Sequence, residues 1–528
     1  MSVDEQNDAT PEAAEWHPSV SPWLIAAAVV LCSFMEVLDT TIMSVALPHM
    51  AGSLSSTNEE ATWVLTSYLV ANGLVMPISG WCSIRFGRKR FLMACTAIFV
   101  GSSFLCAVAP SMGFLVLARI LQGLGGGAMQ PIAQAVLLES FPREKRGIAM
   151  TIFGLVVVLA PVIGPVLGGW LTDNYSWRWT FGINIPLGMV ALTLMARFLE
   201  DPPYIKDAQA GAIDGIGLAL LTLWVATLQI VLDKGQTADW FAATWIRWFS
   251  LVSTCALVAL VVWELRCRNP IVDLSVFRNR NFSVGSGIVV LVSMSMYGSL
   301  TTLPLLLQSL YGYTAEVAGW ATAPRGLGSL VTMILSGLLL AKFDGRWAMV
   351  LGIAGLTAST FTFGRVTLDA GMANFGWPCA FQGAFIGLAL VPGMTYVMAT
   401  LPNEKIGNAS GVFNLVRNLA GSMGISISTT YLTRFSQIYQ SQMVGNLTPY
   451  DPVYQQRMAG LNAMLTPLAG APQAAQQAHG LMFSLVQQQA GYHAFMAVFV
   501  GSAILTGIVV FAPLLMKRVV LSGEIHMH

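Results

Sequence analysis

The sequence predicts an all-α, polytopic membrane protein. Of its 528 residues, 55% are hydrophobic and only 10% are charged, whereas about a quarter of the residues in soluble domains are charged. Apolar runs long enough to cross a hydrocarbon core of ~30 Å occur fourteen times along the chain. Because a backbone in lipid must satisfy its own hydrogen bonds, each run is expected to be a helix.

The predicted spans follow one another with short connections until the last one. They cover residues 23–50, 61–80, 91–109, 113–138, 148–171, 179–199, 213–232, 245–264, 282–308, 317–341, 347–366, 376–401, 405–433 and 491–516. The tail before them, residues 1–22, has five acids and no Lys or Arg, which is the wrong charge for a signal peptide. We therefore expect the first span to be retained.

The distribution of basic residues predicts the orientation. Eighteen of the 27 Lys and Arg residues lie in tails and loops on the side of the N-terminus, and six lie on the other side. This excess places both termini in the cytoplasm, in a multi-pass protein of the cytoplasmic (inner) membrane. The other three, Arg119, Arg325 and Arg417, fall inside predicted spans, where a charge is costly.

Several classes of function find no support in the composition. A net charge of +1, spread by topology, gives no basic patch for nucleic acid. The seven cysteines show neither a disulfide framework nor zinc spacing. No Walker loop is present, so we expect transport to depend on an ion gradient rather than on ATP or another cofactor. A polytopic membrane enzyme is the alternative from another class, and it would need His, Cys or acid residues clustered at one membrane face.

The first span contains two acids near its middle, Glu36 and Asp39. Burying a charge at that depth costs ~2.5–3.5 kcal/mol on insertion scales, so an intramembrane acid indicates a functional site. Their spacing of three residues places them on one face of a helix. The alternative is that both acids only form ion pairs that hold the bundle together.

An internal repeat divides the chain into two halves. The segments 121–127 and 39–42 are echoed at 381–387 and 300–303, and the turn 80–90 has a degraded copy at 337–346, all at an offset close to 260 residues. Such repeats indicate homologous halves around a site near the bilayer midplane. The predicted parts are a tail (1–22), a six-helix half (23–199), a linker with two inserted helices (200–281), a second six-helix half (282–516) with an external loop (435–490), and a tail (517–528).

Five segments carry a resemblance that covers nearly the whole chain. The first-helix motif at 39–48 and the segment 177–186 look like those of the fourteen-span drug:proton antiporters of the major facilitator superfamily, the EmrB/QacA type. The turn 80–90 resembles the loop motif of this superfamily, and 119–127 resembles its helix-4 arginine motif. The segment 154–169 resembles the antiporter motif of the superfamily. The matching positions are Gly80, Arg85, Gly87, Arg88 and Lys89 in the loop motif, and Gly154, Pro161, Gly164, Pro165, Gly168 and Gly169 in the antiporter motif.

The resemblance implies a major facilitator fold and proton-coupled multidrug efflux, with a role in antibiotic resistance. It also implies a periplasmic adaptor protein and an outer-membrane channel as partners, for which the 435–490 loop is one candidate surface. The simplest reading of that loop is a partly helical, partly mobile segment without partners. Ile84 occupies the position where the loop motif usually has an aspartate, which weakens the charge-relay role that the family assigns to that acid.

These motifs also have a physical interpretation. The basic loop residues can bind helix ends and anionic lipid, or simply anchor the topology. Small residues four apart at Gly164 and Gly168 allow a neighbouring backbone to approach, and Pro161 and Pro165 remove backbone donors and favour a bend. Such a bend either packs tightly or acts as a pivot between the halves.

Arg119 is the predicted partner of Asp39. It lies ~10 Å from the outer end of its span, and Asp39 lies ~24 Å from the inner end of the first span, so both fall in the outer half of the core. Their pairing would make protonation of Asp39 depend on the position of Arg119. We therefore predict a proton-coupling site formed by Asp39, Arg119 and Glu36.

The remaining intramembrane polar residues are assigned to a candidate substrate cavity: Arg325, Arg417, Gln122 and Gln382. Two acids and three arginines sum to +1, which favours neutral or weakly acidic amphiphiles over dications. The arginines could instead cap backbone carbonyls. The predicted function is a proton-coupled exporter of lipophilic or amphipathic compounds. The alternatives on the same scaffold are an exporter of one metabolite or siderophore and an uptake symporter, because a fold does not fix substrate or direction.

Overall fold

The computed structural model describes residues 18–56, 58–142, 145–202, 214–267, 270–339, 344–401, 403–445 and 447–518. These residues form helices joined by short turns, which confirms the predicted all-helical fold. The predicted tails and the connector at 200–212 lie largely outside them.

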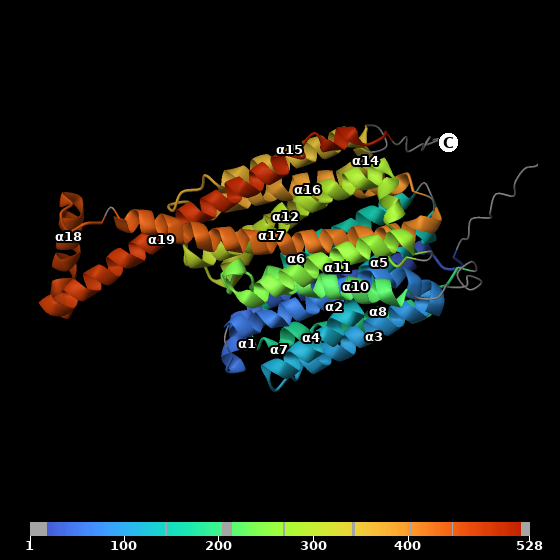
Figure 1. Cartoon of the computed structure of the whole chain (residues 1–528), viewed down its shortest axis with the longest axis horizontal. Helices are drawn as coiled ribbons and strands as arrows, with labels where there is room; N and C mark the ends of the chain where they lie inside the picture. The colour runs from blue at the N-terminus through green and yellow to red at the C-terminus, as the bar shows by residue number, and fades with distance from the viewer. Residues whose placement is uncertain are drawn as a thin grey trace, which may run out of the picture.

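The N-terminal half contains the first six spans (Figure 1). Its helices are α1 (Pro22–Ser53), α2 (Asn58–Phe86), α3 (Arg88–Ala107), α4 (Met112–Gly126), α5 (Met129–Ser140), α6 (Arg146–Asn174), α7 (Arg178–Gly182) and α8 (Asn184–Phe198). The predicted fourth span is thus two helices, α4 and α5, which are separated at Gly127 and Ala128. The sixth span is likewise divided into α7 and α8.

The second half follows the inserted pair of helices. The pair consists of α10 (Gly215–Lys234) and α11 (Thr244–Arg266), with 3-10 turns η2 (Trp240–Ala242) and η3 (Leu274–Arg278). The second half contains α12 (Arg280–Ser309), α13 (Ala315–Thr322), α14 (Pro324–Leu339), α15 (Gly345–Phe363), α16 (Ala373–Ala399), α17 (Asn403–Gly445), α18 (Pro452–Ala469), α19 (Ala471–Gly507) and η4 (Ala512–Leu515).

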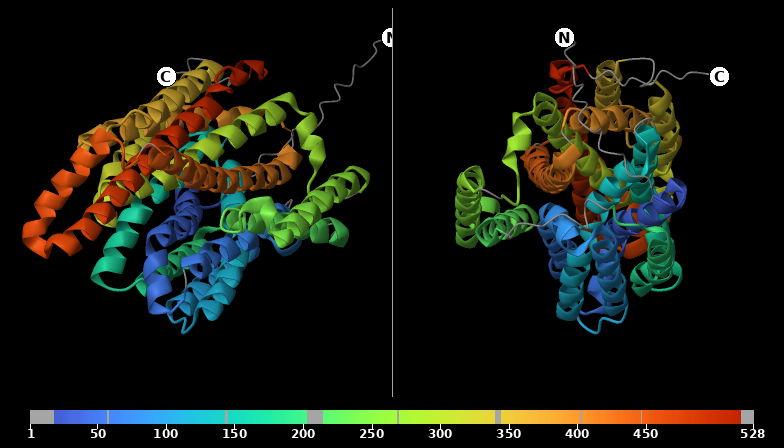
Figure 2. Two further views of the ribbon diagram at one scale, coloured as in Figure 1. Left: turned by 60° about the vertical axis from the view of Figure 1, so that its left-hand side comes forward. Right: turned by 90° about the vertical axis from the view of Figure 1, so that its right-hand side faces the viewer.

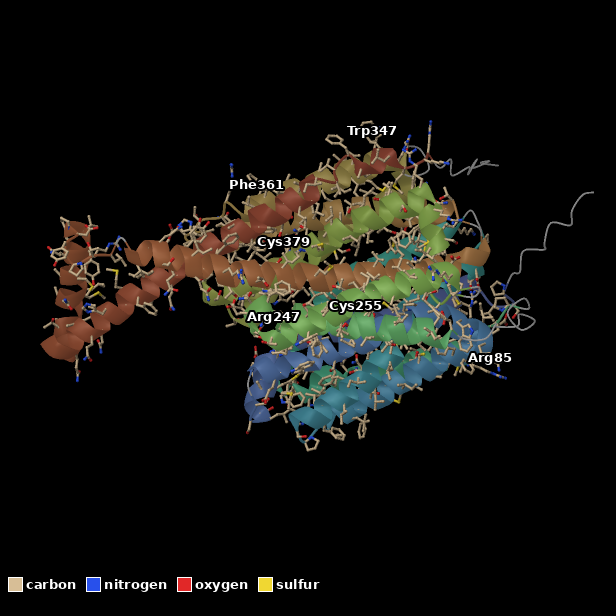
Figure 3. The ribbon with its side chains drawn as sticks, viewed as in Figure 1. Arg85, Arg247, Cys255, Trp347, Phe361 and Cys379 are labelled. Carbon is tan, nitrogen blue, oxygen red and sulfur yellow. The ribbon has the colours of Figure 1, made fainter. Side chains whose placement is uncertain are left out.

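Eleven helices in the described residues are long and apolar enough to cross a membrane on their own. The other three predicted spans correspond to α13 with α14, to α15 and to α17, which lie alongside those eleven in the bundle (Figure 1). Arg85 and Trp347 lie toward the end of the bundle from which the C-terminus leaves, and Arg247 lies toward the opposite end (Figure 3).

The two halves meet along two seams. In one, α6 packs against α13 and α14, where Gly319 faces Val166. In the other, α2 packs against α17, and the Cβ position of Gly411 is 3.3 Å from the Met76 carbonyl. The inserted helices lie beside the main bundle, and α10 contacts both α2 and α17 (Figure 2, right). The inserted pair therefore adjoins one seam rather than separating the halves.

The segment predicted as the 435–490 loop is a helical arm. Helix α17 runs on to Gly445, α18 begins at Pro452 where Asp451 caps its first turn, and α19 begins directly after Gly470. Gly470 has φ +78°, a conformation that glycine adopts at low cost and that ends α18. The arm projects beyond the bundle at the end away from the C-terminus (Figure 1).

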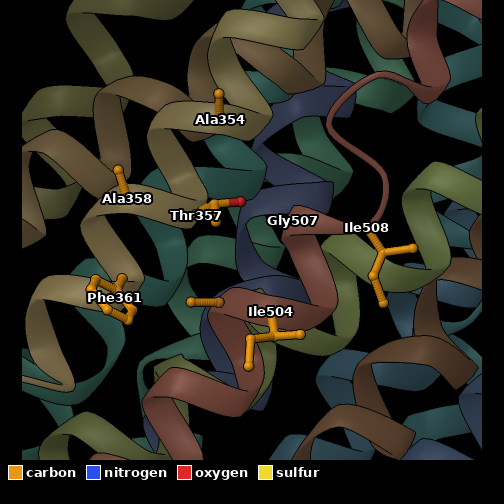
Figure 4. Close-up of a pocket in the computed structure, with 8 residues that line it drawn as sticks. Ala354, Thr357, Ala358, Phe361, Ile504, Gly507 and Ile508 are labelled. Atoms are coloured by element: carbon orange, nitrogen blue, oxygen red, sulfur yellow. The ribbon is translucent and has the colours of Figure 1, made fainter.

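A shallow apolar groove of about 610 Å³ lies between α15 and α19 (Figure 4). It is lined by small and aliphatic side chains such as Ala354 and Ile504, together with Thr357, whose hydroxyl donates to the Thr506 hydroxyl at 3.0 Å. None of the intramembrane acids or arginines lines it, so the groove is separate from the site described next.

Candidate functional site

Glycines in α4 bring the functional side chains together. A Cβ at Gly123 would lie 2.5 Å from the Tyr68 carbonyl of α2, and a Cβ at Gly125 would lie 2.7 Å from the Cys95 carbonyl of α3. Only glycine fits at these contacts, so α4 settles between α2 and α3. This close approach allows Arg119, one turn earlier on α4, to reach the first two helices.

Asp39 and Arg119 form a fully buried ion pair, as predicted from their depth. Arg119 Nη1 donates to Asp39 Oδ2 at 2.6 Å, and both side chains are inaccessible to solvent. Two amides donate to the other carboxylate oxygen, Gln122 Nε2 at 3.0 Å and Asn184 Nδ2 at 2.7 Å. Because α1, α4 and α8 all contribute, any shift between them alters the surroundings of this carboxylate.

Arg119 has further partners that fix its orientation. Its Nε donates to the Val64 carbonyl at 2.9 Å, and Nη1 also donates to Gln122 Oε1 at 2.7 Å. Its guanidinium carbon lies 4.1 Å from the centre of the Tyr68 ring, a cation–π distance. Arg119 therefore links α4 to both α1 and α2.

Glu36 forms a second cluster one turn away on α1. Its carboxylate accepts hydrogen bonds from Asn72 Nδ2 at 2.9 Å, from the Tyr68 hydroxyl at 3.3 Å and from Gln130 Nε2. Tyr68 contacts both Glu36 and Arg119, so it joins the two clusters. The side chain of Glu36 is almost fully buried, at 4% exposure.

Gln130 connects the Glu36 cluster to the other half of the molecule. Arg417 Nη2 of α17 donates to Gln130 Oε1 at 2.5 Å, while the amide nitrogen of Gln130 donates to Glu36. One turn along α5, Gln134 Oε1 accepts hydrogen bonds from Ser410 and Asn414 of α17 at 2.6 and 3.2 Å. A polar bridge thus runs from an acid of the N-terminal half to an arginine of the C-terminal half.

The four residues assigned to one substrate cavity lie in three places. Gln122 belongs to the Asp39 cluster and Arg417 to the Glu36 bridge. Gln382 of α16 donates to Thr360 at 3.0 Å and to Ser299 at 3.3 Å within the C-terminal half. Arg325 of α14 is 5% exposed and packs beside α16.

The antiporter motif lies on α6 where this helix crosses α1. A Cβ at Gly164 would overlap the side chain of Thr41, and a Cβ at Gly168 would lie 2.8 Å from the Ile42 carbonyl. Pro161 and Pro165 lie inside α6, which continues as one helix from Arg146 to Asn174. Gly154 instead faces the other half, because its Cβ position is 2.7 Å from Met333 of α14. Gly169 is buried on the same helix.

The loop motif forms the junction between α2 and α3. Gly87 has φ +83°, and Arg88 pairs with Glu139 of α5. The Lys89 backbone N–H donates to Asp201 at 2.8 Å, and its ammonium donates to the Ala196 carbonyl at 2.7 Å. Asp201, after α8, thus supplies an acid at this junction, where the motif itself has Ile84. Arg85 is exposed.

The corresponding turn of the C-terminal half contains its own acid. Asp344 accepts hydrogen bonds from the Arg346 guanidinium at 2.6 Å and from the Tyr396 hydroxyl at 3.0 Å. These bonds, that of the Arg346 side chain above all, lower the pKa of Asp344 to about 2. Asp344 is therefore ionised at neutral pH and anchors the start of α15.

Sequence reasoning missed several amide and hydroxyl side chains of the two clusters. These are Tyr68, Asn72, Ser103, Gln130 and Asn184, each buried among the spans. The available signal was the same as for the acids, because an uncharged polar group inside a span also needs a partner. Asn184 lies within the resemblance segment 177–186, but its position next to Asp39 depends on how α8 packs on α1.

Comparisons with known proteins identify the family. The family model described as Major Facilitator Superfamily matches residues 29–425. The chain is 36% identical over 469 residues to the multidrug export protein EmrB of Escherichia coli strain K12, covering 88% of this chain and 90% of that protein. It is 38% identical over 434 residues to EmrB of Haemophilus influenzae, covering 82% and 84%.

The fold also matches solved transporter structures. The crystal structure of the human organic anion transporter MFSD10 superposes with a TM-score of 0.57 at 14% identity, covering 92% of this chain and all of that one. At this identity the likeness concerns the fold alone. The family model and the close relatives together show that the chain belongs to the major facilitator superfamily of membrane transporters and, within it, to the EmrB-like group.

Proposed function

We propose that the protein is a proton-coupled antiporter that exports lipophilic or amphipathic compounds by alternating access. The observation that carries the proposal is the buried pair of Asp39 and Arg119, with no solvent exposure and with Gln122 and Asn184 completing the shell. The relatives named multidrug export proteins support the class of substrate. The buried acid supports the choice of the proton as coupling ion.

In the proposed cycle, Asp39 exchanges its proton as Arg119 moves toward or away from it. A nearby guanidinium favours the carboxylate, and its withdrawal favours the protonated acid. The halves rock about the seams of α6 with α13–α14 and of α2 with α17. The Glu36–Gln130–Arg417 bridge crosses between the halves, so rocking must stretch or break it. Each half-cycle therefore changes the surroundings of both acids.

The driving force suffices for accumulation against a gradient. One proton contributes ~1.4 kcal/mol per pH unit and ~2.3 kcal/mol per 100 mV, which can drive a roughly thousandfold substrate gradient. The test is transport by the purified protein in liposomes, with the pH gradient and membrane potential imposed separately. We expect substrate movement to respond to the pH gradient at zero potential and to be accompanied by opposite proton flow. Transport that ignores both gradients would rule out the coupling.

The topology is the first testable consequence. We expect Arg278, after α11, to face the cytoplasm and Gln476, on α19 in the arm, to face outward, because the basic loops mark the inner side. Each is replaced by Cys in a background without the seven native cysteines, and intact cells are treated with a membrane-impermeant maleimide. Labelling is expected at 476 in intact cells and at 278 only after permeabilisation. Labelling of both from one side would contradict fourteen spans.

We further propose that the arm is the docking surface for a periplasmic adaptor protein, which would pass substrate to an outer-membrane channel. The arm projects from the bundle on the proposed outer side and presents exposed apolar side chains, including Tyr450 at 91% and Met464 at 68% exposure. Such side chains are expected at protein contacts rather than facing water.

Deleting α18 within the block 445–480 tests this role. With a short Gly-Ser linker between α17 and α19, we expect export in liposomes to stay within about twofold of wild type, since the main packing of α18 among the described residues is against α19. Resistance of cells that use an adaptor is expected to fall to the level of a strain without the transporter. The control exchanges residues on the exposed face of α18 for Ala. Loss of export in liposomes would instead assign the arm to folding or to the transport cycle.

A further inference from the structure

The three intramembrane arginines differ in how their charges are balanced. Arg119 pairs directly with Asp39, and Arg417 is joined to Glu36 through Gln130. In the described part of the chain, no carboxylate lies within ion-pair distance of Arg325. The net positive charge of these five buried residues is therefore located at Arg325, in the C-terminal half.

Some hydrogen-bond donors of Arg325 have no acceptor among the described residues. Its side chain is 95% buried, since its exposure is 5%, and neither Nε nor Nη2 has a hydrogen-bond partner among the described residues. The Cys379 thiol interacts with it, but a neutral thiol does not balance a charge. A buried guanidinium stays ionised, and leaving such a charge and the N–H groups of two nitrogens unpaired is costly.

The internal repeat relates the surroundings of Arg325 to those of Asp39 in the N-terminal half. Gln382 stands 260 residues after Gln122, and Ser299 stands next to Leu300, where the segment that echoes 39–42 begins. Gln382 donates to Ser299 as Gln122 donates to Asp39, so the two pairs occupy corresponding places in the halves. The C-terminal copy thus has a neutral hydroxyl where the N-terminal copy has a carboxylate.

In the C-terminal half, the guanidinium comes from α14 rather than from α16, the helix that corresponds to α4. The position 260 residues after Arg119 is Cys379, and Arg325 approaches that cysteine from α14. In the N-terminal half, Arg119 bonds the Val64 carbonyl of α2, and α14, which carries Arg325, belongs to the span that the repeat pairs with α2. Both halves therefore place a guanidinium between corresponding helices, but among the described residues the anion is found beside the guanidinium of the N-terminal half alone. Among the described residues, the acceptor Gln382 Oε1, one turn from Cys379, also has no hydrogen-bond partner.

We propose that Arg325 is the anchor of an anion-binding site within the C-terminal half, taking a small monovalent anion such as chloride or a carboxylate group. Charge-assisted bonds from Nε and Nη2 would hold the anion in the role that Asp39 plays for Arg119. The carboxylate could belong to an acidic lipophilic compound that the protein carries, and the chloride would be a resident ion. The site does not depend on proton coupling, because it needs neither Asp39 nor a gradient.

The test is the thermal stability of the purified full-length protein in detergent, titrated with sodium chloride or with sodium benzoate against a sodium sulfate background of constant ionic strength. We expect a saturable rise in the melting temperature. Arg325→Gln should weaken the apparent affinity by about ten- to a hundredfold, because hydrogen bonds to a charged group are lost. The matched control is Arg417→Gln, which removes another buried arginine of the same half and should keep the response.

Comparing chloride with benzoate distinguishes a resident ion from the carboxylate of a transported compound. A response to chloride supports a resident ion, and a response to benzoate alone supports the acidic group of a transported compound. If Arg325→Gln does not fold, Arg325→Lys and a wild-type crystal soaked in bromide replace it, with an anomalous bromide peak expected at the Arg325 guanidinium. A wild-type melting temperature unmoved by either anion, or an equal response in Arg325→Gln, would overturn the proposal. Neither outcome bears on proton exchange in liposomes, which is measured separately.

Discussion

Asp39→Asn is expected to abolish gradient-driven export while leaving substrate binding within about tenfold of wild type. Asn keeps the size of the side chain and can still bond Asn184 and Arg119, but it cannot take up and release a proton. The measurement is export by the purified variant in liposomes under an imposed pH gradient, alongside equilibrium binding of the same compound. Substrate exchange without a gradient is expected to persist, because exchange needs no net proton movement.

Replacing Arg119 and Glu36 distinguishes the residue that carries the proton from residues that only influence its protonation. Arg119→Ala removes the cation 2.6 Å from the carboxylate, so protonation becomes easier and the pH at which transport begins should rise. Glu36→Gln removes the second acid but keeps one acceptor oxygen for Asn72 or Gln130. We expect it to retain partial activity with an altered preference for cationic compounds.

The control for Asp39→Asn is Asn184→Ala, which disturbs the same carboxylate without removing its proton. This variant should retain coupled export with a shifted pH dependence. If Asp39→Asn still exported against a gradient with proton flow intact, the coupling residue would lie elsewhere. Glu36 would then be the next residue to replace, since it is the other described acid buried on α1.

Much of the fold follows from the length and spacing of apolar runs, because lipid forces each run into a helix. The helical structure of the arm could not be predicted in this way, because the same Gln, Ala and Pro composition suits both a loop and a helix. Ala and Gln are good helix formers, and Pro452 lies at the first turn of α18, where a missing N–H costs nothing. Only the caps at Asp451 and Gly470 distinguish two helices from a loop.

The candidate site could be predicted in part, for a related reason. Asp39 and Arg119 stand out because charges are rare in spans, and their matched depth predicts the ion pair that the structure contains. Gln122 was placed in a cavity instead, although it lies one turn from Arg119 on the same face of α4. The cross-half bridge through Gln130 depends on the packing of α5 against α17, which no local pattern specifies.

Gly164→Val is expected to destabilise the protein and to remove most export. The Cβ of any residue at 164 would overlap the side chain of Thr41 and lie 3.1 Å from the Ile42 backbone nitrogen, so α1 and α6 would have to separate. Forcing extra carbons into a packed contact typically costs ~1–3 kcal/mol. Asp39 lies two residues before Thr41, so a displaced α1 also moves the carboxylate away from Arg119.

The measurements are the melting temperature in detergent and export in liposomes, with Gly101→Val as the control. Gly101 of α3 is exposed and has nothing within 4 Å of its Cβ position, so the same substitution there should change neither. Gly164→Ala should have a smaller effect, and adding Thr41→Ala should restore part of it, because the nearest overlapping atom is the Thr41 hydroxyl oxygen. Wild-type stability and export in Gly164→Val would show that α1 and α6 need not approach closely at this crossing. If stability fell but Thr41→Ala gave no recovery, the cost would arise from the Thr41 Cβ and the Ile42 backbone nitrogen, which Thr41→Ala leaves in place.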